Sequence, residues 1–140
     1  MRYRLLTAAL AIAAASADAT EVVTYTGEEN YERLCSACHG ASGRGDGPVS
    51  EVLTMPAPDL TRIAARNDGV FPRDELTRQI DGRDRITAHG SQQMPVWGYE
   101  FWIDAGAGAF SERLVAETLD NLVDYLESIQ VPALGPISGP

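Results

Sequence analysis

The chain has 140 residues, a length typical of one domain, and 44% of them are hydrophobic, enough for a modest core. Acidic side chains outnumber basic ones by 20 to 11, every basic residue is an arginine, and the formal net charge is −9. Such a surface repels nucleic acid, which excludes it as a partner, and also repels anionic membranes; it favours a partner protein with a basic docking patch.

Residues 1–19 have the pattern of a secretory signal peptide. Arg2 and Arg4 precede the apolar run Leu5–Ala15, and Ala17-Asp18-Ala19 is a small-x-small cleavage pattern. As a helix this run would span about 16 Å, too short for a hydrocarbon core of about 30 Å. The pattern predicts cleavage and a soluble chain exported to the periplasm. An uncleaved anchor and a short core helix are the alternatives.

After the signal segment, short helices alternate with loops rich in glycine and proline, and no run shows the alternation of a strand. A first helix is predicted over residues 27–37. Residues 40–48 form a loop by composition. Asp59 or Thr61 is the expected cap of a short helix that ends near residue 66.

The second half of the chain contains the best-defined helix. A helix is expected over residues 72–80, and residues 82–110 are interpreted as mostly loop. Ser111 is the predicted N-cap of a final helix that runs to about residue 130, followed by a frayed tail over 131–140. Apolar residues at helical spacing give this helix a continuous stripe. They are Val115, Leu119, Leu122, Leu126 and Ile129.

The stretch CSACHG places both cysteines of the chain, Cys35 and Cys38, directly before His39. A thioredoxin-like redox pair requires a βαβ pattern, which is missing, and adjacent Cys38 and His39 suit a tetrahedral zinc site poorly. The pattern C-x-x-C-H is the signature of covalent haem attachment. The two thiols lie one helical turn apart and reach two vinyl groups of one haem, while the histidine faces the iron.

With these residues the chain resembles the class I cytochromes c. Gly27, Tyr31 and Cys35 match the first helix of that family, and the loop GRGDGP, the segments PAPDLT and MPVWG, and the terminal LVDYLESI match later elements in order. The resemblance implies an all-α, small cytochrome c fold, with three to five short helices and long loops wrapped around one covalent haem c. It also implies that the Pro48 carbonyl accepts a hydrogen bond from His39.

The resemblance places the second axial ligand in MPVWG, at Met94. Pro95 follows it and keeps the loop extended. His89 lies five residues earlier in the same loop, and Met55 also precedes a proline, so both remain alternatives. His/Met ligation would raise the reduction potential relative to His/His.

Further side chains are candidates to contact the haem. Arg62 and Arg83, and also Arg66 and Arg85, could pair with propionates. Trp97 could donate its indole N–H to a propionate or pack on the haem edge. The aromatic residues of the segment that follows could cover that edge or form an exposed docking patch. These are Tyr99, Phe101 and Trp102.

No catalytic constellation is present, so the sequence predicts an electron carrier and not an enzyme. The expected domain covers residues 20–130. The predicted protein is a soluble, monomeric, periplasmic monohaem cytochrome that passes single electrons between redox partners. The alternatives are a haem subunit of a larger periplasmic dehydrogenase or oxidase complex, and a haem-based sensor with an open sixth site.

Overall fold

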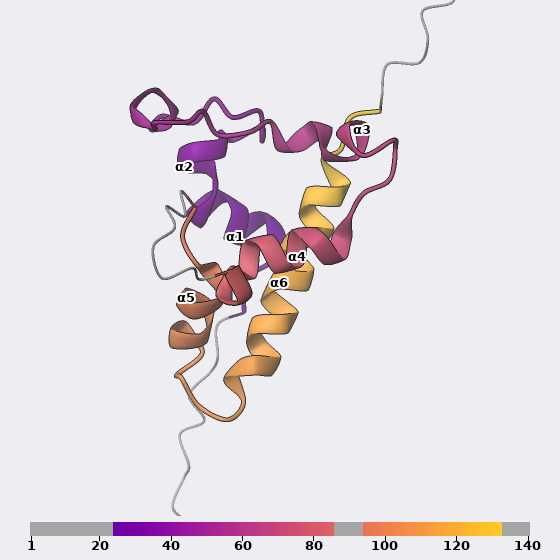
Figure 1. Cartoon of the computed structure of the whole chain (residues 1–140). Helices are drawn as coiled ribbons and strands as arrows, with labels where there is room; N and C mark the ends of the chain where they lie inside the picture. Colours follow the sequence, from indigo (N-terminus) through magenta and orange to yellow (C-terminus); the bar gives the residue numbers. More distant parts are fainter. Residues whose placement is uncertain (1–23, 86–93, 133–140) are drawn as a thin grey trace, which may run out of the picture.

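The protein is all-helical in a computed structural model that describes residues 24–85 and 94–132 (Figure 1). Within these ranges the structure has six α-helices, three 3₁₀-helices and no strand, which confirms the predicted fold class. The α-helices are α1 (Gly27–Leu34), α2 (Ser36–His39), α3 (Ile63–Arg66), α4 (Arg73–Asp81), α5 (Trp97–Asp104) and α6 (Ser111–Ser128). The 3₁₀-helices are η1 (Ser50–Val52), η2 (Leu60–Arg62) and η3 (Arg83–Arg85).

The predicted first helix is divided in two at Cys35. Thr26 and Glu29 form a capping box at the start of α1, in which the Thr26 hydroxyl accepts from the Glu29 amide and the Glu29 carboxylate accepts from the Thr26 amide. At Cys35 the φ angle widens to −111°, and α2 then begins with no side-chain cap. The C-x-x-C-H motif therefore lies on a separate helical turn, whose direction differs from that of α1 (Figure 1).

The crossing of α1 and α6 depends on one glycine and two tyrosines. A Cβ atom on Gly27 would lie 2.0 Å from the carbonyl oxygen of Asn121, so only glycine allows the two backbones to approach this closely. The rings of Tyr31 and Tyr125 pack beside this contact, with centroids 5.1 Å apart. Tyr31 is fully buried. Gly27 and the two tyrosines therefore form the contact at which α1 crosses α6.

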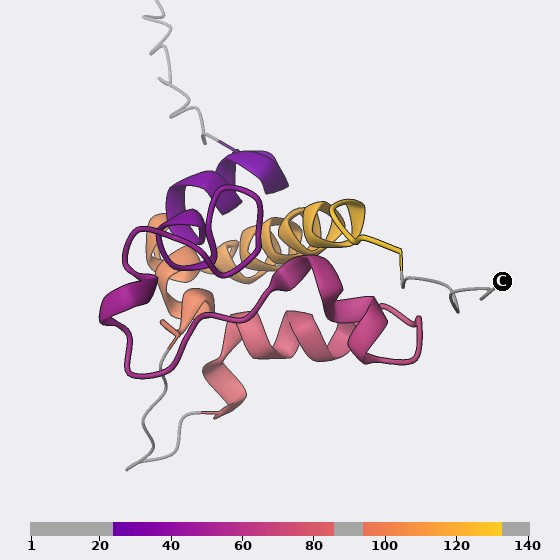
Figure 2. The same ribbon diagram turned by 90° about the horizontal axis from the view of Figure 1, so that it is seen from above.

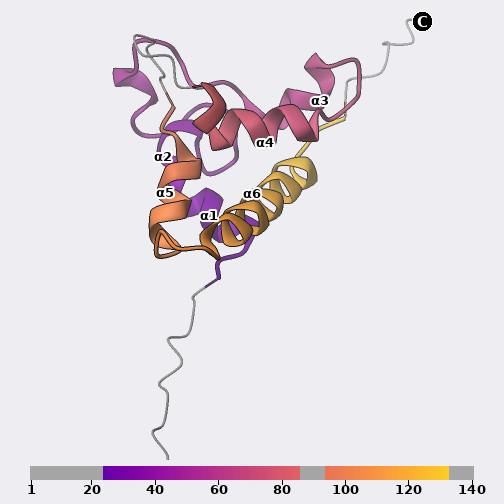
Figure 3. The ribbon, with the colours of Figure 1, turned by 60° about the horizontal axis from the view of Figure 1, so that its bottom comes forward.

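Helix α6 is the axis of the core. Its predicted apolar stripe is buried as far as Leu126, and Ile129 is half-buried. Helices α1, α4 and α5 all pack against it (Figure 3). Ser111 was predicted to be the N-cap of α6, but it is the first residue of that helix. Its hydroxyl accepts a hydrogen bond from the Gly108 amide and donates one to the Ala105 carbonyl. Ser111 thus closes the turn before α6.

The interpretation of residues 82–110 as mostly loop was wrong, because η3 and α5 lie within it. Phe101 is buried in the core, whereas Tyr99 and Ile103 on the same helix are exposed. This segment carries large apolar side chains on several faces and therefore shows no clear helical stripe in sequence. Its helical state depends on Phe101 packing against α6.

Ion pairs connect α4 to α6. Arg73 at the start of α4 binds Asp120, Asp124 and Glu127, which follow one another along α6, at N–O distances of 3.0, 2.6 and 2.5 Å. Hydrogen bonds to these carboxylates raise the pKa of Arg73 above its ordinary value. At the other end, Gly82 terminates α4 in the left-handed conformation, with φ of 69°.

Candidate functional site

The two cysteines and His39 lie on one turn of helix and are all half-buried. Backbone bonds from Cys38 and His39 to the Cys35 carbonyl, at 3.1 and 2.9 Å, hold this turn. Gly40 follows with φ of +81° and ends α2. The Tyr31 hydroxyl donates to the Gly40 carbonyl at 2.6 Å and so ties the end of the motif to the α1–α6 crossing.

The chemistry of the Cys35 thiol does not suit a redox pair. Burial, followed by the neighbouring Cys38, raises the pKa of Cys35 to about 12. A nucleophilic cysteine needs the opposite shift, since only the thiolate attacks a disulfide. The zinc alternative has no support in the described ranges either, because nowhere in 24–85 or 94–132 do three His, Cys, Asp or Glu side chains converge as a metal site.

The proline whose carbonyl faces His39 is Pro58 and not Pro48. The Nδ1 atom of His39 lies 3.1 Å from the carbonyl oxygen of Pro58. Since a carbonyl only accepts, Nδ1 carries the proton, and the lone pair of Nε2 is left for a metal. The residues on either side of Pro48 instead bond α2: the Gly47 amide donates to Cys38 and the Val49 amide to Ala37.

This correction has a physical reason in the path of the loop. The segment around Pro48 runs along α2, held by those two backbone bonds, and the chain returns to the imidazole only ten residues later. Figure 2 shows this loop as a wide arch from α2 toward α3. Gly45 permits the return, because a Cβ atom at this left-handed residue (φ +82°) would lie 2.2 Å from the Ala57 carbonyl oxygen.

Three contacts hold the turn that follows Pro58. The Leu60 amide donates to the Gly43 carbonyl at 2.6 Å. The Asp59 carboxylate accepts from the amide and the hydroxyl of Thr61, at 2.8 and 2.6 Å, as the predicted cap of this short helical segment. The Arg66 guanidinium donates to the Asp59 carbonyl at 2.8 Å. The carbonyl that faces His39 therefore belongs to a braced turn.

The Asp59 cap is expected to make stability depend on acid pH. The hydrogen bond from the Thr61 hydroxyl, helped by the Thr61 amide and two nearby arginines, lowers the pKa of Asp59 in the folded protein. Its contribution is complete above the unfolded pKa of about 3.9 and is lost as pH falls through the lower folded pKa. Asp59→Asn should flatten this acid limb, measured as the denaturation midpoint between pH 2 and 6. A slope identical to that of the wild type would contradict the assignment.

The predicted sixth ligand, Met94, is half-buried against the core cluster. Other half-buried apolar side chains that pack on the same cluster come from α1, from the braced turn and from the segments entering α4 and α5. They are Leu34, Cys35, Leu60, Phe71 and Trp97. The chain entering α5 lies on the same side of the molecule as α2 (Figure 1). Met55 is 59% exposed, and His89 lies outside the described residues.

Residues 23–126 match the family model of cytochrome c oxidase, cbb3-type, subunit III. The chain belongs to this family. It is therefore a c-type cytochrome, whose domain binds haem and iron and carries electrons, as the resemblance implied. No curated protein and no solved structure matches it. No helix within the described ranges of this cytochrome is long and apolar enough to cross a membrane.

The donor set of this cytochrome fits a covalently attached haem. Two half-buried thiols lie one turn apart, a histidine whose Nδ1 proton is already bonded follows them, and a half-buried thioether precedes α5 on the same side of the molecule. A neutral imidazole with a bound Nδ1–H and a thioether sulfur are typical iron ligands in cytochromes c. The half-buried apolar side chains that pack on the core cluster with Cys35 and Met94 suit the faces of a macrocycle.

The structure does not support the predicted propionate role of Arg83. Its guanidinium binds Asp81 through two N–O contacts of 2.6 and 3.2 Å and Glu112 through two of 2.9 and 3.0 Å. These pairs raise the pKa of Arg83, with the Asp81 hydrogen bond as the largest cause. A Cβ atom on Gly98 would lie 1.7 Å from the Asp81 carboxylate and 2.7 Å from Arg83 Nε, so the Asp81–Arg83 ion pair packs directly against α5. Arg83 thus links α4, α5 and α6.

The remaining candidates differ in position. Arg62 is exposed, and its charge helps to lower the pKa of Asp59; its propionate contact stays a prediction. Trp97 stacks on Phe101 with ring centroids 6.1 Å apart and packs on the core, while its hydrogen bond to a propionate stays untested. Trp102 is half-buried and Tyr99 is 47% exposed. The aromatic segment is therefore partly core and not one continuous patch.

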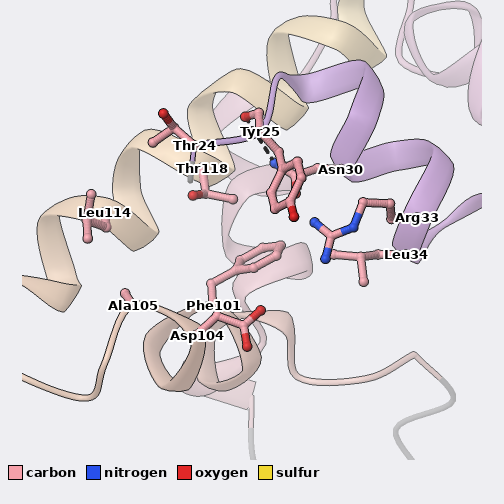
Figure 4. A pocket seen from close by; sticks show the side chains of 10 residues that line it. All are labelled: Thr24, Tyr25, Asn30, Arg33, Leu34, Phe101, Asp104, Ala105, Leu114 and Thr118. Atoms are coloured by element: carbon pink, nitrogen blue, oxygen red, sulfur yellow. Dashed lines mark hydrogen bonds between the residues drawn. The ribbon is translucent and has the colours of Figure 1, made fainter. Parts of the chain in front are cut away.

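A hollow of about 90 Å³ lies between α1, α5 and α6 (Figure 4). Two of the residues that line this hollow make a cation–π contact, with the Arg33 guanidinium 3.8 Å from the centre of the Tyr25 ring. Phe101 and Asp104 line the α5 side. Its lining includes none of the haem-binding candidates, and its volume is too small for a cofactor of that size.

Proposed function

We propose that this protein is a soluble, exported monohaem cytochrome that transfers single electrons, with Cys35 and Cys38 as thioether anchors and His39 and Met94 as axial ligands. The observation that carries the proposal is the hydrogen bond from His39 Nδ1 to Pro58 beside the half-buried cysteine pair. When bound, haem supplies a one-electron Fe(II)/Fe(III) couple.

Residues of the chain would hold the haem iron and set its reduction potential. The Pro58 carbonyl holds the Nδ1 proton of His39, which fixes the tautomer and raises the basicity of Nε2. Met94 and the other half-buried apolar residues that pack on the core cluster would exclude water from the haem and thereby disfavour the ferric charge. The acidic surface, with 20 acidic against 11 basic residues in the whole chain, favours a monomer that docks transiently on a basic partner.

Membership of a larger oxidase is a second candidate, and the name of the matching family, which is that of an oxidase subunit, favours it. Native purification separates the two functions. A free carrier elutes alone at the size of a monomer, whereas a subunit elutes with haem- or copper-containing partners after mild detergent extraction.

The carrier function predicts one haem per chain and a closed sixth site. Alkaline pyridine spectra of the purified holoprotein should give a c-type haem at a ratio of one, retained on the denatured chain. The reduced spectrum should not change under carbon monoxide at neutral pH, because both axial positions are filled. Rapid carbon monoxide binding would instead support the sensor alternative and would overturn the His/Met proposal.

A further inference from the structure

Gln130 lies just beyond α6, and its side-chain amide holds three backbone groups. Its Nε2 atom donates to the Leu60 carbonyl at 2.8 Å and to the Leu126 carbonyl at 2.7 Å. Its Oε1 atom accepts from the Ala64 amide at 2.9 Å. Gln130 is half-buried, so its side chain takes the place of water as the hydrogen-bond partner of these three backbone groups. One side chain thus connects the end of α6 to η2 and to α3.

Two further contacts strengthen this junction. The Val131 amide donates to the Thr61 carbonyl at 2.9 Å, so the chain is still held at the first residue of the predicted tail. A Cβ atom on Gly43 would lie 3.0 Å from the Cδ1 atom of Ile129 and 3.4 Å from the Cγ2 atom of Thr61. The end of α6, the loop after the haem motif and η2 therefore pack against one another.

The junction leads directly to His39. Leu60, which accepts from Gln130, is two residues from Pro58, and its own amide is bonded to Gly43. The carbonyl of Pro58 is the acceptor for His39 Nδ1. A shift of the turn away from α6 would therefore move that carbonyl relative to the imidazole, although Gln130 itself does not touch the histidine.

We propose that Gln130 is a positioning residue for the axial histidine: its amide fixes the turn over residues 60–64, so that the Pro58 carbonyl stays bonded to His39 Nδ1. This inference rests on the proposed function, in which His39 binds the haem iron. In this role the C-terminal end of α6 controls how firmly the proximal ligand is held.

The test is solvent exchange of two protons in the ¹⁵N-labelled ferrous holoprotein, followed by NMR. One is the His39 Nδ1 proton and the other is the Ala64 amide proton. Gln130→Leu removes the donor and the acceptor at similar volume. Both protons should exchange about tenfold faster or more than in the wild type, because the variant loses three hydrogen bonds, of which those to Leu60 and Ala64 hold the turn.

Two control variants separate positioning from general loss of stability. Ser128→Ala removes a surface hydrogen bond to Tyr125 in the last turn of α6 and should leave both rates unchanged. Val123→Ala removes fully buried core atoms and lowers global stability. It should leave the His39 rate unchanged, since that proton exchanges by local opening.

A second variant keeps the test decisive if Gln130→Leu does not fold. Gln130→Glu retains the acceptor for Ala64 but loses the donor to Leu60, so it should accelerate His39 exchange in the same direction by a smaller factor. Faster Ala64 exchange with an unchanged His39 rate would overturn the proposal. Failure of the proposed function would look different, because the wild type itself would then lack a haem-shifted His39 Nδ1 resonance.

Discussion

Met94→Ala is expected to abolish the near-infrared sulfur-to-iron band of the ferric holoprotein and to let the ferrous iron bind carbon monoxide. The thioether is the proposed sixth ligand, and alanine offers no donor in its place. Because a thioether stabilises ferrous iron, the reduction potential should also fall, by on the order of 0.1–0.3 V within the range of about 0.8 V that axial ligands span.

Met55→Ala is the matched control, because Met55 is also followed by proline but is 59% exposed on the loop after η1. It should leave the band, the potential and the inertness to carbon monoxide as in the wild type. If the band survives in Met94→Ala but disappears in Met55→Ala, Met55 and not Met94 is the sixth ligand. A band that survives in both variants would exclude both residues as the ligand.

Gly27→Ala is expected to cause a large loss of stability. The new methyl group would lie 2.0 Å from the Asn121 oxygen and 2.9 Å from the Tyr125 Cβ, so the backbones of α1 and α6 would have to separate. We expect the free energy of unfolding to fall by about 3 kcal/mol, the upper end for overpacking, despite the better helix propensity of alanine. The melting temperature should fall by about 10 °C.

Gly108→Ala is the control for this substitution. Its added Cβ would meet its nearest atom only at 3.9 Å, and its φ is not in the left-handed region. Urea denaturation of the three holoproteins should place Gly108→Ala within about 0.5 kcal/mol of the wild type. An equal, small effect at both positions would show that the helix crossing relaxes at little cost, against the tight packing seen around Gly27.

The turn that carries Cys35, Cys38 and His39 and the crossing of α1 and α6 were predictable because each depends on local spacing. Cys35, Cys38 and His39 are adjacent in sequence, and the i, i+4 spacing of Gly27 and Tyr31 places them on one face of a helix. The buried stripe of α6 follows from the same helical period. Helix α5 was missed because its apolar residues occupy several faces, and only packing of Phe101 selects the inner one.

The sequence alone therefore determined the turn that places Cys35, Cys38 and His39 together and the two helices that cross, since adjacency and periodicity encode both. Only the tertiary structure decided that Pro58, and not Pro48, faces His39, and that Arg83 is bound by Asp81 and Glu112. Both depend on groups distant along the chain: the loop returns to the imidazole only where Gly43 and Gln130 hold Leu60. Local spacing carries no information about such partners, because long-range packing selects them.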